Sequence, residues 1–235
     1  MLLAIDIGNT RIKWGLHDGR GWLQCLHTSN GLAGIVAELA ADPHQLIISN
    51  VGDPCLTTDI FRYFNNIRQH VVQAQAQQCG VRNGYQTPQQ LGSDRWAAIL
   101  GAYKLGASTV VVVNAGTALT VDALYAGEFL GGSIGPGYQL MRDSLAQRVG
   151  LPLGDAAHMC EFATNTVDAL SSGCINAMLG SVQRMQSSLA SLSRSQPEIW
   201  LTGGDAPRLL PHLSARLEHH LVLEGLYHIA LEIFA

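Results

Sequence analysis

The chain has 235 residues, of which 47% are hydrophobic and 14% are charged, and its formal net charge is −4. This composition provides for a substantial core and argues against intrinsic disorder. No basic run offers a track for phosphodiesters, so nucleic acid is not an expected partner. The N-terminus lacks a signal-peptide pattern, and no apolar run approaches the ~20 residues that span a bilayer. We therefore expect a cytoplasmic protein with no membrane partner.

Hydrophobic periodicity in the first half predicts alternating strands and helices. Strands are expected at 2–7, 11–16, 22–27 and 45–49, and helices at 32–41, 56–65 and 93–105. A turn at Gly8, Asn9 and Thr10 makes a hairpin of the first two strands. The glutamine-rich segment 73–79 is expected to be an exposed connection.

The second half begins as the first did. Strands are expected at 109–113, 118–124, 128–134 and 198–202, and helices at 166–192 and 223–234. Residues 3–10 and 111–118 share the order of strand, polar residue, small turn and strand, offset by 108 residues. A repeat of half the chain predicts two similar α/β domains facing one another, 1–107 and 108–235. Chance similarity of two hairpins is the alternative.

The apolar stripe of the helix at 166–192 repeats every three or four residues. Its members are Val167, Leu170, Cys174, Met178, Val182, Met185, Leu189 and Leu192. Periodicity leaves two roles open for this helix, packing in the core or forming a dimer face.

The cysteines and histidines form no ligand pattern. The five cysteines are scattered and never spaced as C-x-x-C, which argues against a disulfide framework and a structural zinc site. We expect buried free thiols instead.

The first glycine turn has the chemistry of a phosphate site. Asp6 ends a buried strand, Gly8 permits close backbone approach, and the amides of Asn9 and Thr10 can donate to an anion. Lys13 follows the turn, and a carboxylate beside phosphate donors suits a Mg²⁺-nucleotide. An ordinary hairpin is the alternative for this motif alone. Turns at Gly116-Thr117 and Gly203-Gly204 repeat the pattern, whereas no P-loop or Rossmann fingerprint is present.

Asp94 lies in the first turn of the helix predicted at 93–105, where a helix N-terminus favours its ionised form. It could accept the proton of a substrate hydroxyl, and Arg95 could bind an anionic substrate as a planar fork. The alternative is a Ser93 cap followed by a favourable acid and a surface arginine.

Taken together, these segments resemble type III pantothenate kinases. Seven motifs fall in that family's order, namely Asp6–Thr10, Asn83–Tyr85, Gly92–Arg95, Gly116–Asp122, Gly131–Gly137, Asn165-Thr166 and Thr202–Gly204. The resemblance implies a fold of two ribonuclease-H-like, actin-like ATPase domains with mixed sheets flanked by helices and an interdomain cleft. It also implies ATP-dependent phosphorylation of pantothenate, the first step of coenzyme A biosynthesis, by a homodimer with its substrate pocket near the dimer interface.

The same resemblance assigns roles to residues. Asp94 would be the catalytic proton acceptor, and Asp6 would position Mg²⁺ through water. Residues that would bind ATP are Asp6, Ile7, Gly8, Asn9, Thr10, Arg11, Ile12, Lys13 and, from the second domain, Thr117. Residues that would bind pantothenate are Tyr85, Gly92, Ser93, Asp94, Arg95 and Thr166.

One departure from the family concerns Asn114, where the family usually has an aspartate that helps to bind a monovalent cation, K⁺ or NH₄⁺. Asparagine has a carbonyl oxygen but no charge, so activation by such a cation is expected to be weak or to depend on other oxygens.

Two other functions compete with this interpretation. One is a different acceptor on the same fold, such as a sugar, against which the match at Tyr85 and 92–95 argues. The other is a nucleotide-binding regulatory or accessory protein. Intact Asp6, Asp94 and Arg95 favour catalysis.

Overall fold

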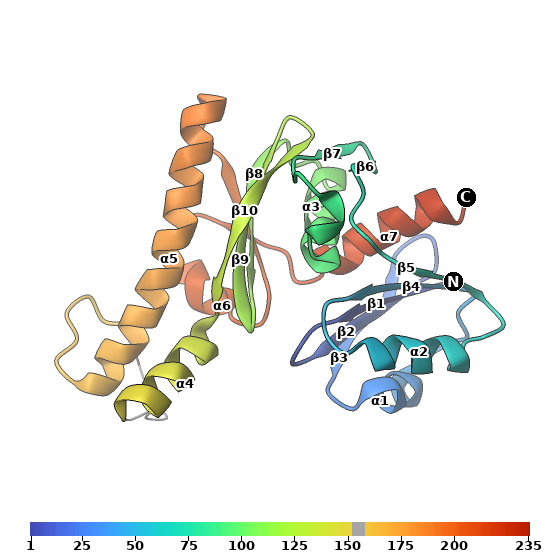
Figure 1. The fold of residues 1–235 in the computed structure, drawn as a ribbon, viewed down its shortest axis with the longest axis horizontal. Helices are drawn as coiled ribbons and strands as arrows, with labels where there is room; N and C mark the ends of the chain where they lie inside the picture. The colour runs from blue at the N-terminus through green and yellow to red at the C-terminus, as the bar shows by residue number, and fades with distance from the viewer. Residues whose placement is uncertain (152–157) are drawn as a thin grey trace. The chain divides into compact units, whose positions relative to one another are not determined.

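A computed structural model describes residues 1–151 and 158–235, which form two compact units. Unit 1 comprises Met1–Ala107, Gly127–Phe129 and His220–Ala235, and unit 2 comprises Ser108–Ala126 and Leu130–His219. Both are α/β units with a mixed sheet flanked by helices (Figure 1), so the predicted fold class is confirmed. No helix in the described part of the chain is long and apolar enough to cross a bilayer.

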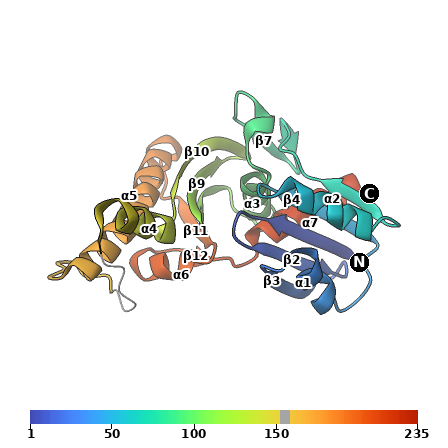
Figure 2. The same ribbon diagram turned by 60° about the horizontal axis from the view of Figure 1, so that its bottom comes forward.

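Unit 1 is built on a five-stranded sheet in the order β3-β2-β1-β4-β5. These strands are β1 (Leu2–Ile7), β2 (Ile12–His17), β3 (Trp22–Thr28), β4 (Gln45–Asn50) and β5 (Arg68–Val71). β1 pairs antiparallel with β2 and parallel with β4. Helices α1 (Gly31–Glu38) and α2 (Pro54–Tyr63) cover one face, and α3 (Ser93–Lys104) and α7 (Leu221–Ile233) cover the other (Figure 2).

The structure corrects one end of the predicted domain division, because the C-terminal helix belongs to unit 1 rather than to the second domain. Glycines allow α7 to pack closely on α3. A Cβ on Gly225 would lie 1.8 Å from the Ala97 carbonyl oxygen, and one on Gly101 would lie 2.4 Å from that of Leu221. A division of the chain by sequence order cannot predict that its last helix returns to pack on the first half.

The remainder of unit 1 includes the short strands β6 (Gln77–Gln78) and β7 (Val81–Asn83) and the 3₁₀ turn η1 (Pro88–Gln90). The predicted exposed connection at 73–79 is therefore wrong in part. Gln78 is buried, and its side-chain oxygen accepts a hydrogen bond from the Trp96 indole at 2.9 Å, which satisfies the buried amide.

Unit 2 contains the first five strands of the second sheet, which has the order β12-β11-β8-β9-β10-β7-β6. Its strands are β8 (Thr109–Ala115), β9 (Ala118–Tyr125), β10 (Glu128–Pro136), whose first two residues lie in unit 1, β11 (Glu198–Thr202) and β12 (Arg216–Leu217). Its helices are α4 (Tyr138–Val149), α5 (Thr166–Ser193), α6 (Ala206–Leu209) and the 3₁₀ turn η2 (Leu210–His212). β8 runs antiparallel to β9 and parallel to β11.

The apolar stripe of α5 packs in the core of unit 2 against β8 and β9. The exceptions are the two ends of the stripe, Val167, which is half-buried and outside the core cluster, and Leu192, which is 56% exposed. Of the two roles left open by periodicity, this stripe therefore takes the core role.

The cysteines of the described residues are all free thiols, but not all are buried as predicted. Cys79 and Cys174 are buried, Cys25 and Cys160 are half-buried, and Cys55 is exposed. Over the same described residues, no group of three or more His, Cys, Asp or Glu side chains could hold a metal ion.

Candidate active site

The carboxylate of Asp6 lies near the end of β1 and faces the N-terminus of α3. Its partner across the sheet is Ser49 of β4, whose Oγ donates to Asp6 Oδ1 at 3.1 Å. The Ser93 hydroxyl lies 3.0 Å from Ser49 Oγ, and because the Ser49 proton is used for Asp6, Ser93 is the donor there. All three side chains are buried. A hydrogen-bonded chain thus joins Asp6 to the residue that precedes Asp94.

Asp6 and Asp94 are close enough for their charges to interact. Burial, followed by repulsion from Asp94, raises the pKa of Asp6 to about 7, while Lys13 and the Ser49 hydroxyl act in the opposite direction. Burial also raises the pKa of Asp94, opposed by the backbone amide and the charge of Arg95. Lys13 lowers both pKa values and faces Asp6 directly across the β1–β2 pair. The site thus concentrates negative charge that Lys13 and Arg95 only partly offset.

Two glycines allow close packing beside these carboxylates and the first turn. A Cβ on Gly92, the N-cap of α3, would lie 2.7 Å from Asp94 Oδ1. A Cβ on Gly52 would lie 2.8 Å from the Gly8 carbonyl oxygen, so this glycine lets the segment after β4 pack under the first turn. Side chains at either position would displace a group of the site.

Arg95 is only 5% exposed, which excludes the alternative of a surface arginine. Its Nη1 donates to the Tyr85 hydroxyl oxygen at 2.9 Å, and the guanidinium carbon lies 5.8 Å from the centre of the Tyr85 ring. Tyr85 in turn stacks on Phe129, with ring centroids 5.5 Å apart. A buried, aromatic-supported guanidinium is suited to binding a carboxylate as a planar fork.

The residues that flank the first glycine turn point their side chains to opposite faces of the sheet of unit 1. Side chains alternate along a strand, so Asp6 and Lys13 point to the α3 face whereas Ile7 and Ile12 lie in the core cluster under α1 and α2. Within the turn, the Gly8 amide donates to the Arg11 carbonyl at 3.2 Å. Of the residues predicted to bind ATP here, Ile7 and Ile12 therefore point their side chains away from the face that holds Asp6 and Lys13.

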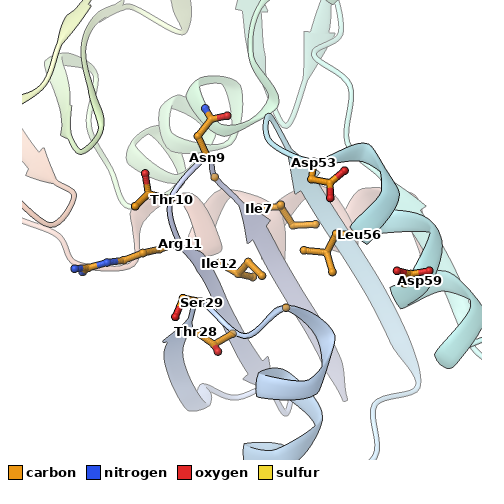
Figure 3. A pocket seen from close by; sticks show the side chains of 12 residues that line it. Ile7, Asn9, Thr10, Arg11, Ile12, Thr28, Ser29, Asp53, Leu56 and Asp59 are labelled. Atoms are coloured by element: carbon orange, nitrogen blue, oxygen red, sulfur yellow. The ribbon is translucent and has the colours of Figure 1, made fainter. Parts of the chain in front are cut away.

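A pocket of about 480 Å³ lies on the α1 and α2 side of the same turn (Figure 3). Ile7, Ile12 and Leu56 form its apolar floor, and Asp53 and Thr28 stand at its edges. Because neither Asp6 nor Asp94 lines it, this pocket is separate from the paired carboxylates.

The remaining predicted residues belong to unit 2. Thr117 is exposed on the turn between β8 and β9, where the Gly116 amide donates to the Ala118 carbonyl at 3.0 Å. Asn114 is the last residue but one of β8, opposite Thr120 on β9 and Thr202 on β11. Thr166 is the exposed first residue of α5, next to the cap Asn165, whose Oδ1 accepts from the Asp168 amide at 2.9 Å.

The comparison with known proteins gives the family. A model of the family described as type III pantothenate kinase matches residues 2–188. The chain belongs to this family. A type III pantothenate kinase from Nitrosospira multiformis is 42% identical over 240 residues, which cover 99% of this chain and 92% of that protein. Another, from an Azoarcus species, is 43% identical over 241 residues, covering 98% and 90%. The resemblance drawn from the seven motifs is confirmed, and this chain is a kinase of that family.

The two solved structures compared next are below 25% identity and therefore show the fold alone. A proposed Baf family transcriptional activator from Campylobacter jejuni has a TM-score of 0.64 at 22% identity, with 98% of both chains covered. A proposed 2-dehydro-3-deoxygalactonokinase from Sinorhizobium meliloti has a TM-score of 0.59 at 16% identity, with 100% of this chain and 99% of that chain covered.

Unit 1 of this pantothenate kinase brings together seven of the residues singled out in the sequence. They are Asp6, Lys13, Tyr85, Gly92, Ser93, Asp94 and Arg95. Sequence reasoning missed Ser49, which links Asp6 to Ser93. It also missed Gly52, whose lack of a side chain allows close contact with the first turn. Ser49 could have been found in the sequence, because it is the polar residue that ends the apolar run Leu46-Ile47-Ile48.

The donor set of unit 1 fits a magnesium ion carried by a nucleotide. Mg²⁺ retains several waters and needs only one or two protein carboxylates when phosphate oxygens supply the rest. Burial first, and then repulsion from Asp94, raise the pKa of the Asp6 carboxylate. A divalent cation would relieve that repulsion, which supports Asp6 as a ligand through water.

Proposed function

We propose that this chain transfers the γ-phosphoryl group of ATP to the primary hydroxyl of pantothenate in the cytoplasm, as the first step of coenzyme A biosynthesis. The observation that carries the proposal is the approach of the buried Asp6 to the half-buried Asp94. Asp6 is hydrogen-bonded through Ser49 to Ser93, the residue before Asp94, and Lys13 offsets part of the negative charge. Phosphoryl transfer needs in-line positioning and neutralisation of charge more than covalent help from the protein.

On the acceptor side, we place the carboxylate of pantothenate against Arg95 and Tyr85. The hydrogen bond between them fixes the guanidinium before substrate arrives, which lowers the cost of ordering it. Gly92, Ser93 and Asp94 would bind the hydroxyl end, and Thr166 would contribute from unit 2.

On the nucleotide side, residues 6–13 would bind phosphates of ATP and Thr117 would contact them from unit 2. The amides of the first turn donate to phosphate oxygens, and Lys13 neutralises charge beside Asp6. Magnesium held through water by Asp6 would neutralise charge on the transferring phosphate oxygens. This proposal requires the two turns to meet across an interdomain cleft, which stays a prediction.

Asp94 would orient the acceptor hydroxyl and take its proton late in the transfer. A pKa raised by burial makes the carboxylate a better base than an exposed aspartate, while the Arg95 amide and charge keep it from rising further. Asp94 lies in the first turn of α3, so its side chain is held on a rigid helix.

Activation by a monovalent cation tests the departure at Asn114. The Oδ1 of Asn114 lies 2.7 Å from where a Cβ of Gly203 would be, and the Ala115 carbonyl lies 2.3 Å from it, so two oxygens face this glycine. Because these oxygens carry no formal charge, we expect less than about threefold activation by KCl at fixed ionic strength. Asn114→Asp should lower the K⁺ concentration for half-activation. Strong, saturable activation of the unaltered chain would show that the neutral side chain suffices.

Assembly as a homodimer is part of the proposal. Unit 2 exposes large apolar side chains that a second copy could cover, namely Ile134 on β10, Leu140, Leu145 and Val149 on α4, and Phe162, which is 85% exposed. Sedimentation equilibrium should then give about 50 kDa, twice the 25.2 kDa of one chain. A concentration-independent mass of one chain would reject the dimer.

An acceptor panel tests the proposed reaction. ADP release, coupled to a dehydrogenase, should require ATP, Mg²⁺ and pantothenate together, and sugars should not replace pantothenate. Release with a sugar alone would favour the alternative acceptor. Nucleotide binding without turnover on any acceptor would favour an accessory role.

A further inference from the structure

The three glycine-rich turns of unit 2 are bound to one another around Thr117. The Thr117 carbonyl accepts from the amide of Gly137 at 3.0 Å, and the Ala115 carbonyl accepts from the amide of Asp205 at 2.9 Å. The turn at 116–117 is therefore held on one side by the segment that enters α4 and on the other by the segment that leaves β11.

Both contacts depend on close backbone approach. A Cβ on Gly137 would lie 1.9 Å from the Gly116 carbonyl oxygen, and one on Gly203 would lie 2.3 Å from that of Ala115. Gly203 also has a φ of +97°, which side chains rarely adopt. The turns at Gly116-Thr117 and Gly203-Gly204, which are separate in the sequence, and the segment at Gly137 thus form one packed assembly.

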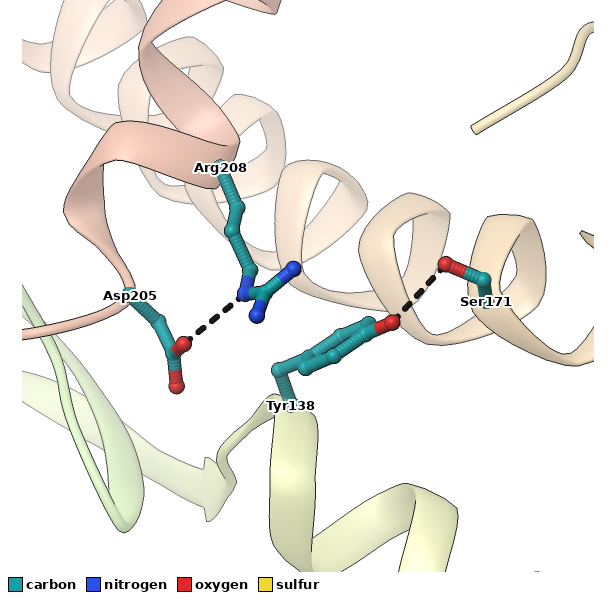
Figure 4. Close-up of polar contacts among 4 residues, drawn as sticks. All are labelled: Tyr138, Ser171, Asp205 and Arg208. Carbon is teal, nitrogen blue, oxygen red and sulfur yellow. Dashed lines mark hydrogen bonds and ion pairs between the residues drawn. The ribbon is translucent and has the colours of Figure 1, made fainter. Parts of the chain in front are cut away.

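A cluster of side chains ties together the two outer segments of this assembly (Figure 4). Tyr138, the first residue of α4, is 1% exposed, and its hydroxyl lies 2.9 Å from Ser171 Oγ on α5. The guanidinium carbon of Arg208 lies 4.3 Å from the centre of the Tyr138 ring, and its Nε donates to Asp205 Oδ1 at 3.0 Å. Arg208 therefore connects the residue after Gly137 to the residue whose amide holds Ala115.

These contacts form a closed circuit of interactions, which runs from Thr117 through Gly137, Tyr138, Arg208 and Asp205 to Ala115. A cation over an aromatic face and a carboxylate on the same guanidinium are attractive together, and both fix the planar group in one orientation. Arg142 also places its guanidinium carbon 5.4 Å from the same ring centre. None of these side chains belongs to the first turn or to the paired carboxylates of unit 1.

We propose that Arg208 and Tyr138 are positioning residues for ATP, which hold the turn of Thr117 in the geometry that binds the nucleotide. The inference rests on the proposed function, in which Thr117 contacts ATP. It predicts that loss of these contacts weakens the binding of ATP but not of pantothenate. The circuit of interactions supports the turn of Thr117 and does not include Arg95, Tyr85 or Asp94.

Arg208→Ala should raise the KM for ATP by about tenfold, the loss expected for one stacked and paired guanidinium, and leave the KM for pantothenate within about twofold. Arg208→Lys keeps the charge but not the planar fork, so it should restore part of the affinity. Tyr138→Phe removes the hydroxyl but keeps the ring under Arg208, and it should change the KM for ATP by less than about threefold.

Arg216→Ala is the matched control within unit 2. Arg216 lies 4.2 Å over the Trp200 ring, bonds Glu218 at 2.6 Å and is 49% exposed, against 48% for Arg208. It has the same chemistry but no contact with the three turns, so the KM for ATP should not change. Thermal unfolding of each variant identifies loss of fold, in which case Arg208→Lys and Arg208→Gln supply the comparison.

Equal increases in both KM values, or an effect of Arg216→Ala as large as that of Arg208→Ala, would overturn the inference in favour of a general role in stability. An unchanged KM for ATP in a folded Arg208→Ala would also overturn it. Failure of the proposed function is distinguishable, since the unaltered chain would then not turn over pantothenate at all.

Discussion

Asp94→Asn is expected to lower kcat with pantothenate by about 10²- to 10⁴-fold, the usual contribution of a positioned general base. The amide keeps the shape of the side chain and still fits beside Gly92, so the fold and the binding of ATP should persist. Steady-state kinetics should therefore show the loss in kcat, and calorimetry should give a Kd for ATP within about threefold of the unaltered chain.

Two further variants separate the chemistry of Asp94 from its position. Gly92→Ala keeps the carboxylate but puts a Cβ 2.7 Å from the present position of Asp94 Oδ1, which must shift, so this variant should also lower kcat. Asp42→Asn, an exposed aspartate elsewhere in unit 1, should behave as the unaltered chain. Near-normal turnover of Asp94→Asn would remove Asp94 from the mechanism.

Asp6→Asn is expected to make the protein more stable at pH 8 and unable to bind Mg²⁺-ATP productively. The pKa of Asp6 is raised from 3.8 to about 7, chiefly by burial, so above pH 7 the folded state carries a buried charge that it resists. A shift of this size corresponds to roughly 4 kcal/mol, of which we expect about half or more to be recovered by the neutral amide. Ser49 can still donate to the amide oxygen.

The sign of the pH dependence follows from the direction of that shift. Between pH 3.8 and 7 the folded state binds more protons at Asp6 than the unfolded state does, so its contribution is fully present below pH 3.8 and is lost as the pH rises through 7. Asp6→Asn should remove this dependence. Mg²⁺-ATP should raise the melting temperature of the unaltered chain and not that of the variant.

Urea unfolding at pH 5 and pH 8 measures both effects. Asp18→Asn is a control of opposite sign, because the amides of Arg20 and Gly21 lower the pKa of that exposed carboxylate. It should give no gain in stability at pH 8. A less stable Asp6→Asn at pH 8, or one that keeps Mg²⁺-dependent turnover, would contradict the assignment of Asp6.

Local patterns in the sequence predicted most of the fold. An apolar run located β1, alternation located β2, and the stripe of α5 identified most of the residues that pack on β8 and β9. The strand β5 and the helix α4 were missed, because Arg68–Val71 is short and polar and α4 keeps several leucines exposed. Neither has a pattern that contrasts a buried face with a polar one.

The candidate site was predictable where residues are adjacent in sequence. Gly92 to Arg95 begin one helix, and the turn at 8–10 follows one strand. Ser49 and Arg208 were not predictable, since each acts by linking segments that the fold brings together. The position of α7 in unit 1 has the same cause, a glycine contact between Gly225 and Ala97 across more than half the chain.

A structure of the complex with pantothenate, Mg²⁺ and a non-hydrolysable ATP analogue tests the central claim most directly. The account predicts that an Asp94 carboxylate oxygen lies about 2.6–3.2 Å from the primary hydroxyl of pantothenate, with the γ-phosphate held between the turns of Gly8 and Thr117. A pantothenate hydroxyl directed away from Asp94, or a triphosphate bound by only one of the two turns, would contradict it.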